Sequence, residues 1–249
     1  MLRHTVDGSG PPVLLLHGFA LDARMWRPQV RALAGAYRVI TVDLPGFGPS
    51  PTGAGDATTA RAIVDTLDAL TSEPAHVAGL SLGGAVAVDL ALAFPHRVRS
   101  LTLIDAVLLR HSPGARAWPA AAALAKEGKL SEAREAWLAD PLFAAASARP
   151  DVLSVVREMV DDYSGDHWSG RATTRFEVTD PAARLAEIAC PTLVLVGEHD
   201  LPSFRAMADA YAAAIARATL EVIPGAGHLA SMEAPDAVNA RMGRFLAEA

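Results

Sequence analysis

The sequence predicts an α/β protein with a mostly parallel, doubly wound sheet of about seven to eight strands. Short runs of consecutive apolar residues, such as residues 13–16, are typical of strands covered on both faces. These runs alternate with segments of helical length and spacing, which favours a parallel sheet with helices on both faces. The 249 residues are 51% hydrophobic and 20% charged, so the chain can form a sizeable core.

The expected elements follow one another along the chain in regular alternation. Seven segments are expected to be strands, namely residues 2–6, 13–16, 38–42, 75–78, 98–104, 192–196 and 219–223. Five segments between or after them have helical length and spacing, namely residues 23–34, 58–70, 85–94, 202–216 and 235–247. Gly- and Pro-rich turns separate these elements, as at residues 43–48, and Pro95 closes the third helix.

The pattern changes between residues 106 and 180. Strand-like runs vanish there, Ala, Arg and Glu become more frequent, and helical spacing appears at residues 115–126, 131–139 and 151–163. Four prolines separate these pieces. We expect residues 106–180 to form a helical cap, or lid, inserted into a core made of residues 1–105 and 181–249.

Composition argues against several classes of function. The net charge of −6 and the lack of a Lys/Arg cluster argue against a nucleic-acid partner. The single cysteine, Cys190, excludes an intramolecular disulfide and any multi-cysteine metal site. Residues 1–12 carry no signal-peptide core, and no apolar run approaches the roughly 20 residues of a membrane span. We expect a cytoplasmic protein that needs no cofactor, metal or membrane.

The hexapeptide G-L-S-L-G-G at residues 79–84 lies between an expected strand and an expected helix. A serine on a sharp strand-to-helix turn needs small residues two positions before and after it, because the strand and the helix nearly touch there. Gly79 and Gly83 supply that room. The free N–H groups at the start of the helix favour developing negative charge. The pattern predicts that Ser81 is a nucleophile.

A nucleophilic serine needs a base and an acid, which should follow other strands later in the chain. Asp200 ends the motif G-E-H-D after the strand at 192–196, and His228 ends G-A-G-H after the strand at 219–223. An imidazole titrates near neutral pH, so His228 can take the serine proton and return it to the leaving group. Asp200 would hold the imidazole tautomer and stabilise the cation that forms.

Other residues compete for these roles. Asp105 also ends an expected strand and is an alternative acid, and Glu198 is a weaker one. His199 adjoins Asp200 and is expected at the rim, whereas His17 is expected to hydrogen-bond loop backbone. The sequence has no H-E-x-x-H motif or similar His/carboxylate set, which argues against a metal site.

An acyl-transfer site also needs donors that stabilise the oxyanion. The backbone N–H of Leu82 lies directly after the nucleophile, at the start of the helix. The second donor should come from the loop after the early strand at 13–16, where Gly18 permits a tight turn. We therefore predict that Phe19 and Leu82 form the oxyanion hole through their backbone N–H groups.

These motifs together resemble the α/β-hydrolase superfamily over essentially the whole chain. The resemblance rests on H-G-F at 17–19, D-L-P-G-F-G-P-S at 43–50, the hexapeptide, G-E-H-D and G-A-G-H. The segment H-G-F-A-L-D-A-R-M-W and the small cap resemble the branch of 3-oxoadipate enol-lactonases and small carboxylesterases. The resemblance implies an α/β-hydrolase fold with an eight-stranded sheet, a cap after the sixth strand, and Ser81, Asp200 and His228 as the catalytic triad.

Two features depart from the superfamily pattern. The chain has room for little more than one strand before Val13, so the usual leading hairpin is expected to be shortened. The nucleophile is a serine, which argues against the dehalogenases and epoxide hydrolases of this superfamily, where an aspartate stands at the turn.

The substrate is less well defined by the sequence. Six apolar residues are candidates for the binding site, namely Leu21, Met25, Val107, Trp137, Trp168 and Leu229. Arg24, Arg110 and His167 are candidates for meeting an anionic substrate, but no convincing cationic cluster is present. A neutral or weakly polar small ester or lactone is therefore favoured over a dicarboxylate.

We hypothesise a carboxylic ester hydrolase, an esterase or lactonase that works through an acyl-enzyme. The alternatives are a C–C bond hydrolase or a proton-abstracting lyase with the same triad, similar to the menaquinone-pathway enzyme, and a ligand receptor with little turnover. The expected partner is a small-molecule ester or lactone. The sequence leaves open whether the chain is a monomer or a homo-oligomer.

Overall fold

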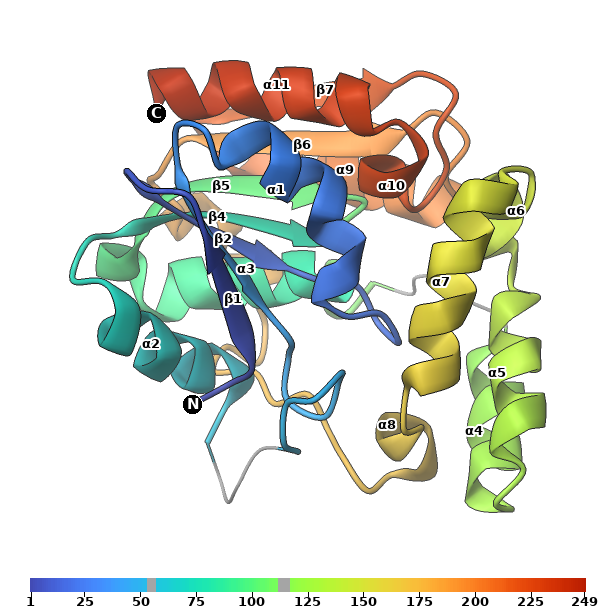
Figure 1. Cartoon of the computed structure of the whole chain (residues 1–249). Helices are drawn as coiled ribbons and strands as arrows, with labels where there is room; N and C mark the ends of the chain where they lie inside the picture. Colours follow the sequence, from blue (N-terminus) through green and yellow to red (C-terminus); the bar gives the residue numbers. More distant parts are fainter. Residues whose placement is uncertain (53–56, 112–116) are drawn as a thin grey trace.

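A seven-stranded sheet runs through the middle of the computed structural model, which describes residues 1–52, 57–111 and 117–249 (Figure 1). The strands lie in the order β1-β3-β2-β4-β5-β6-β7. Their bounds are β1 His4–Asp7, β2 Pro12–Leu16, β3 Arg38–Val42, β4 Ala75–Leu80, β5 Val98–Ile104, β6 Thr192–Gly197 and β7 Ala218–Ile223. Only β1 pairs antiparallel, at the edge beside β3, and the other pairs are parallel.

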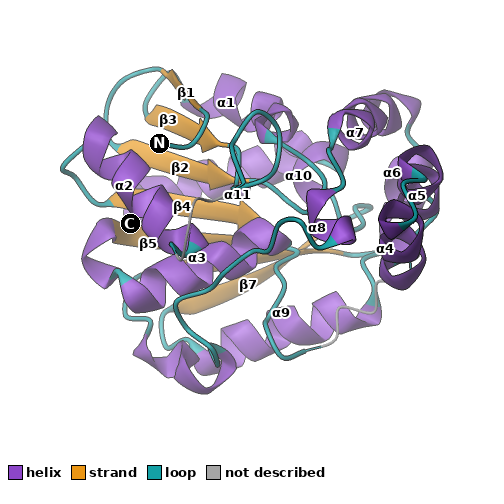
Figure 2. Cartoon of the chain, turned by 90° about the horizontal axis from the view of Figure 1, so that it is seen from below, coloured by secondary structure: helices purple, strands orange, loops and turns teal. Residues whose placement is uncertain are grey.

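The central strands are buried on both faces, as their continuous apolar runs predict. Every residue of β2, β4 and β6 is buried, and Leu14 of β2 lies between Ile40 of β3 and Val77 of β4. The edge strand β1 is mostly exposed. Helices α1 (Arg27–Leu33) and α11 (Pro235–Glu248) cover one face, as Figures 1 and 2 show together.

The opposite face is covered by α2 (Thr59–Leu70), α3 (Leu82–Ala93) and α9 (Pro202–Ala214) (Figure 2). Helix α3 is apolar on all sides apart from Asp89, and it packs against β2, β4, β5 and α2. The two-sided helix arrangement and the mostly parallel sheet confirm the predicted fold class.

A helical segment lies between β5 and β6, beyond the carboxyl ends of the strands (Figures 1 and 2). Its helices are α4 (Trp118–Lys126), α5 (Leu130–Leu138), α6 (Ala144–Ser147), α7 (Pro150–Asp162) and α8 (Asp166–Ser169), with the 3-10 turn η3 (Pro141–Phe143) before α6. The expected helix at 115–126 begins at Trp118 within the described part of the chain, and residues 115 and 116 lie outside it.

The number of strands and the place of the helical segment, as the resemblance implies them, both need correction. The described residues form seven strands rather than eight, and the helical segment follows the fifth strand of this chain rather than the sixth. A single strand, β1, precedes β2 in the described residues, where the resemblance implies a hairpin.

Polar contacts join the helical segment and its C-terminal connection to the sheet-bearing core. Arg24, in the 3-10 turn η1 (Ala23–Trp26), lies 2.7 Å from an Asp22 oxygen and 2.8 Å from an Asp162 oxygen at the end of α7. Asp89 of α3 is buried and accepts hydrogen bonds from the backbone N–H groups of Glu177 and Val178. Among the described residues, no helix is both long enough and apolar enough to cross a membrane.

Candidate active site

Ser81 lies at the sharp turn between β4 and α3, near the carboxyl end of the sheet. Its backbone has φ +52° and ψ −112°, a strained conformation for a residue with a side chain. A Cβ atom on Gly79 would lie 2.2 Å from the Gly83 oxygen, and one on Gly83 would lie 2.1 Å from the Leu16 oxygen. Both positions therefore require glycine, which is the reason for the G-x-S-x-G spacing.

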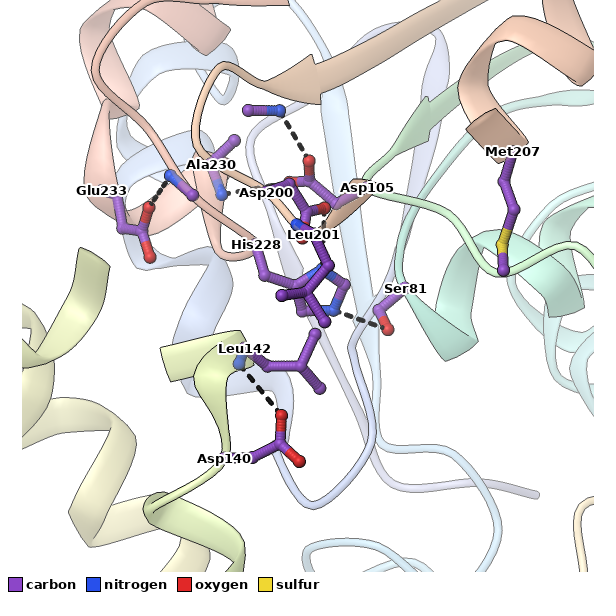
Figure 3. A network of polar contacts seen from close by, with 12 residues as sticks. Ser81, Asp105, Asp140, Leu142, Asp200, Leu201, Met207, His228, Ala230 and Glu233 are labelled. Carbon is purple, nitrogen blue, oxygen red and sulfur yellow. Dashed lines mark hydrogen bonds and ion pairs between the residues drawn. The ribbon is translucent and has the colours of Figure 1, made fainter. Parts of the chain in front are cut away.

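His228 and Asp200 extend from the loops that follow β7 and β6, and they reach Ser81 as one hydrogen-bonded chain (Figure 3). The His228 Nε2 lies 3.0 Å from the Ser81 Oγ, and the His228 Nδ1 lies 3.0 Å from the Asp200 Oδ2. All three residues are buried. Because the carboxylate accepts from Nδ1–H, the neutral ring presents a bare Nε2 to the serine hydroxyl.

The loop between β6 and α9 that carries Asp200, which we call the acid loop, and the His228 ring are both held in place by their neighbours. The other oxygen of Asp200, Oδ1, accepts the backbone N–H of Leu201 at 2.7 Å. The ring of Phe204, in the first turn of α9, lies 4.2 Å from the His228 ring, measured between centroids. The imidazole therefore has little freedom to turn away from Ser81.

The two residues predicted for the oxyanion hole line the same cavity as Ser81 and His228. The N–H of Leu82 belongs to the first turn of α3, where backbone N–H groups have no partner within the helix. Phe19 lies in the loop after β2, next to Gly18. A Cβ on Gly18 would meet the Leu80 side chain at 2.8 Å, so the loop passes close to the end of β4.

His17 holds this loop, as expected from its place after β2. Its Nδ1–H donates to the Gly18 carbonyl oxygen at 2.8 Å, and its Nε2 accepts the Leu44 N–H at 2.9 Å. Burial lowers the pKa of His17. The ring therefore stays neutral, since a protonated Nε2 could not accept from Leu44.

Asp105, the alternative acid, lies beside the chain of three residues but makes other contacts. Its Oδ1 accepts the Gly197 N–H at 2.8 Å, and its Oδ2 accepts the Ala230 N–H at 3.2 Å. Burial raises the pKa of Asp105 well above its usual range, and the neighbouring Asp200 carboxylate adds to the rise. The carboxyl group that meets His228 is that of Asp200.

A cavity of about 590 Å³ opens above Ser81, between the strand ends and the helical segment. Of the six predicted lining residues, Leu21, Val107, Trp137 and Leu229 contribute to its wall. Met25 and Trp168 do not. Met25 is a residue of η1 whose side chain is fully buried in the core, and Trp168 is covered by the rings of Tyr163 and Trp137 at centroid distances of 4.9 and 6.0 Å.

Several wall residues were not among the predicted binding residues. They are Gly18, Leu80, Trp118, Pro119, Leu142, Phe143, Ala172, Thr173, Thr174 and Phe204. His167, considered above for an anionic substrate, also lines the cavity. Trp118 and Phe143 reach the cavity from α4 and η3, and nothing in their local sequence distinguishes them from packing residues of a helix. Phe204 had a usable signal, since it follows Asp200 by four residues at the start of a helix.

The wall is apolar and rich in aromatic rings. The ring of Phe19 lies within 5.7 Å, between centroids, of the rings of Trp118, Trp137 and Tyr163. Among the described residues that line the cavity, none is Lys, Arg, Asp or Glu. Two arginines considered for an anionic substrate are engaged elsewhere, Arg24 with Asp22 and Asp162, and Arg110 with the Thr179 carbonyl oxygen.

The described part of the chain holds no group of three or more His, Cys, Asp or Glu residues placed to bind a metal ion. The arrangement is instead suited to nucleophilic chemistry, because a hydroxyl, a base and an acid lie in sequence beneath an apolar cavity.

Known proteins are similar to this chain over most of its length. A family model described as the alpha/beta hydrolase fold matches residues 11–235. A relative from Azorhizobium caulinodans that is named a carbamate hydrolase, RutD, is 32% identical over 99% of this chain and 95% of its own length.

Two solved structures are similar over nearly the whole chain. The enol-lactonase from Burkholderia xenovorans LB400 superposes with a TM-score of 0.85 at 26% identity, covering 99% of this chain and 96% of the other. A thermophilic esterase from Thermogutta terrifontis superposes with a TM-score of 0.84 at 31% identity, covering 99% of this chain and 93% of the other.

Proposed function

The chain belongs to the α/β-hydrolase family, and on that premise we propose that it is a serine hydrolase that cleaves an uncharged carboxylic ester or lactone through an acyl-enzyme. The observation that carries the proposal is the chain of two 3.0 Å contacts from Asp200 through His228 to the Ser81 Oγ. The family relationship supports a hydrolase, and the geometry and apolar wall of the site support the finer proposal of an ester or lactone substrate.

In the first half of the reaction, the Ser81 Oγ attacks the carbonyl carbon of the substrate. His228 takes the hydroxyl proton at Nε2 as the bond forms, and Asp200 stabilises the resulting imidazolium through Nδ1–H. The backbone N–H groups of Phe19 and Leu82 donate to the oxyanion of the tetrahedral intermediate. The imidazolium then protonates the leaving alcohol or, in a lactone, the ring oxygen.

In the second half, water releases the acid. His228 removes a proton from the water as it attacks the acyl-enzyme, and a second tetrahedral intermediate forms at the same donors. Its collapse frees the carboxylic acid and restores the Ser81 hydroxyl with the proton held by His228. No cofactor takes part in either half of this scheme.

The helical segment acts as the lid in this proposal, within the expected insertion at 106–180. Trp118, Trp137 and Phe143 come from it and face the same cavity as Ser81, so it supplies much of the apolar wall. A closed apolar wall excludes water and strengthens the hydrogen bonds made to the oxyanion. It also favours an uncharged acyl or alcohol group.

The test compares the wild-type protein with Ser81→Ala, using p-nitrophenyl acetate, p-nitrophenyl butyrate and a fluorophosphonate probe. We expect hydrolysis and stoichiometric labelling by the wild type, and loss of both in the variant. A variant that cannot form the acyl-enzyme should lose at least about 10³-fold in kcat/KM. Wild-type protein that neither hydrolyses these esters nor accepts the label would refute the proposal.

A further inference from the structure

The most unusual carboxylate near the site is that of Asp105, the residue directly after β5 (Figure 3). Asp105 is 1% exposed, and its φ of +46° lies in the left-handed region that residues other than glycine seldom adopt. Its two oxygens are used by backbone N–H groups, Oδ1 by Gly197 and Oδ2 by Ala230. The acyl-transfer scheme assigns no role to this buried, strained group.

The two N–H donors, those of Gly197 and Ala230, flank the acid loop that carries Asp200 and the loop after β7 that carries His228, the histidine loop. Gly197 is the last residue of β6 and precedes Asp200 by three positions. Ala230 begins the short helix α10 (Ala230–Glu233) and follows His228 by two positions. One carboxylate therefore bridges the start of the acid loop and the end of the histidine loop.

The backbone around Asp105 is also bonded to the nucleophile. The Ser81 N–H donates to the Ile104 carbonyl oxygen at 3.0 Å, and the Val107 N–H donates to the Ser81 carbonyl oxygen at 3.1 Å. Residues on both sides of Asp105 thus hold the strained Ser81 turn. The same short stretch fixes all three members of the Ser81–His228–Asp200 chain.

The chemistry of the position calls for a carboxylate. Two N–H groups approach from different loops, so two acceptor oxygens are needed. An asparagine of the same shape offers one acceptor oxygen and one NH₂ group, which would face an N–H donor with another donor. The N–H groups of Gly197 and Ala230 favour the charged carboxylate and lower the pKa of Asp105, against the rise that burial and the Asp200 charge cause.

We propose that Asp105 is a positioning residue that clamps the acid loop to the histidine loop and so sets the contact between Asp200 and His228. It does not touch the substrate or the reacting atoms. Loss of the clamp lets the two loops separate, and a misplacement of about 1 Å in such a site lowers the rate by roughly 100-fold. This inference rests on the proposed function for its kinetic readout.

The test uses Asp105→Asn with Asp89→Asn as the matched control. Asp89 is also buried and also accepts two backbone N–H groups, those of Glu177 and Val178, but it lies along α3 away from the site. Both variants should lower Tm. Only Asp105→Asn should lower kcat, by about 10- to 100-fold with KM changed less than about twofold.

A second readout needs no turnover. The Nδ1–H of His228, bonded to Asp200, is expected to give a low-field proton signal in NMR spectra of the wild type and of Asp89→Asn. In Asp105→Asn the signal should be lost or exchange faster with water. The groups that face His228 are Asp200 from the acid loop, Phe204 from α9 and Glu233 from α10, and none of them is altered.

Ala230→Pro tests the clamp from the donor side if Asp105→Asn does not fold. Proline is tolerated at the first position of a helix and removes the N–H that Asp105 Oδ2 accepts. It should lower kcat relative to Asp89→Asn by less than the roughly 100-fold upper value expected for a misplaced site, because the bond from Gly197 remains, and an unchanged kcat would contradict the clamp.

The proposed role of Asp105 is refuted if Asp105→Asn keeps the wild-type kcat and the low-field signal of His228 although its Tm decreases as much as that of Asp89→Asn. A wild-type protein without hydrolysis or labelling would refute the proposed function instead. The NMR comparison would still decide the clamp in that case, so the two failures are distinguishable.

Discussion

At the scale of single residues, the strain at Ser81 is the clearest structural feature. A side chain at φ +52° costs about 1–3 kcal/mol of conformational energy. Glycine adopts this region freely, although it gains about 0.5–1 kcal/mol of backbone entropy in the unfolded chain. We expect Ser81→Gly to be more stable than Ser81→Ala by about 1 kcal/mol, and both to be inactive. Urea unfolding of the two variants measures the difference.

The comparison with Ser81→Ala separates strain from the loss of the hydroxyl, because both variants lack the Oγ that meets His228. Equal stability of the two variants would mean that the turn relaxes once the hydroxyl is removed. In that case the strain would come from the Ser81–His228 contact and not from the backbone.

Residue identities could be predicted where the local sequence dictates geometry. The turn at Ser81 needs glycine two positions before and after the serine, and Gly79 and Gly83 meet this requirement. Asp200 and His228 follow strands whose apolar runs are easy to recognise. The contacts of Asp105 could not be predicted in this way. They depend on the N–H groups of Gly197 and Ala230, which lie 92 and 125 positions away.

At the scale of elements, the approach of α3 to β2 depends on Gly83. Its Cβ would lie 2.1 Å from the Leu16 oxygen and 2.7 Å from the His17 oxygen, and backbone cannot yield easily. We expect Gly83→Ala to destabilise the fold by at least about 3 kcal/mol despite the better helix propensity of alanine. Thermal or urea unfolding measures this change.

Gly35→Ala is the control for that variant. No atom lies within 4 Å of a Cβ built on Gly35, so the substitution should change the free energy of unfolding by less than about 0.5 kcal/mol. Similar stability of the two variants would contradict the close contact between α3 and β2 that the turn requires.

The elements themselves could be predicted to differing degrees. Fully buried strands such as β2 and β6 can be predicted because they are unbroken apolar runs. Long helices such as α9 and α11 can be predicted from the helical spacing of their apolar residues. Helices α6, α8 and α10 have four residues each, which is too short for a period to be read. These short helices form through packing against distant segments, and one of them, α8, places the wall residue His167.

At the scale of the whole molecule, buried histidines make stability depend on pH. Burial lowers the pKa of His76 from 6.5 to about 4, and it lowers that of His167 to about 4. At pH values between the folded-state pKa of about 4 and the ordinary pKa of 6.5, the unfolded chain binds protons that the folded chain does not. The free energy of unfolding therefore falls as the pH falls from about 6.5 to 4. Each histidine contributes at most about 3 kcal/mol to this loss.

His76→Gln tests this loss because glutamine does not titrate and can still hydrogen-bond the Ser100 hydroxyl. We expect urea unfolding at pH 7 and pH 5 to show a smaller difference for this variant than for the wild type. The exposed His96→Gln should behave as the wild type does. A wild-type stability that does not change between pH 7 and pH 5 would contradict the prediction.

The cavity is also a property of the whole molecule, since the sheet supplies its floor and the helical segment much of its wall. A substrate carboxylate placed against this wall would lose its water without gaining a cation from the described lining residues. p-Nitrophenyl butyrate and mono-p-nitrophenyl succinate share a leaving group and a four-carbon acyl chain, and differ in a terminal methyl or carboxylate. We expect kcat/KM to favour the butyrate by at least about 100-fold, a difference of about 2.7 kcal/mol.

Adding a cation to the wall should reduce that preference. Val107 is half-buried and lines the cavity, and Val107→Arg keeps the backbone N–H that bonds to Ser81. We expect the ratio of kcat/KM for the butyrate to kcat/KM for the succinate to fall at least about tenfold in this variant, because the guanidinium can pair with the substrate carboxylate. Val155→Arg adds the same charge on α7, outside this cavity, and should leave the ratio unchanged. Equal rates for both esters with the wild-type protein would mean that a carboxylate finds a partner at the site, and an anionic substrate would then replace the uncharged one.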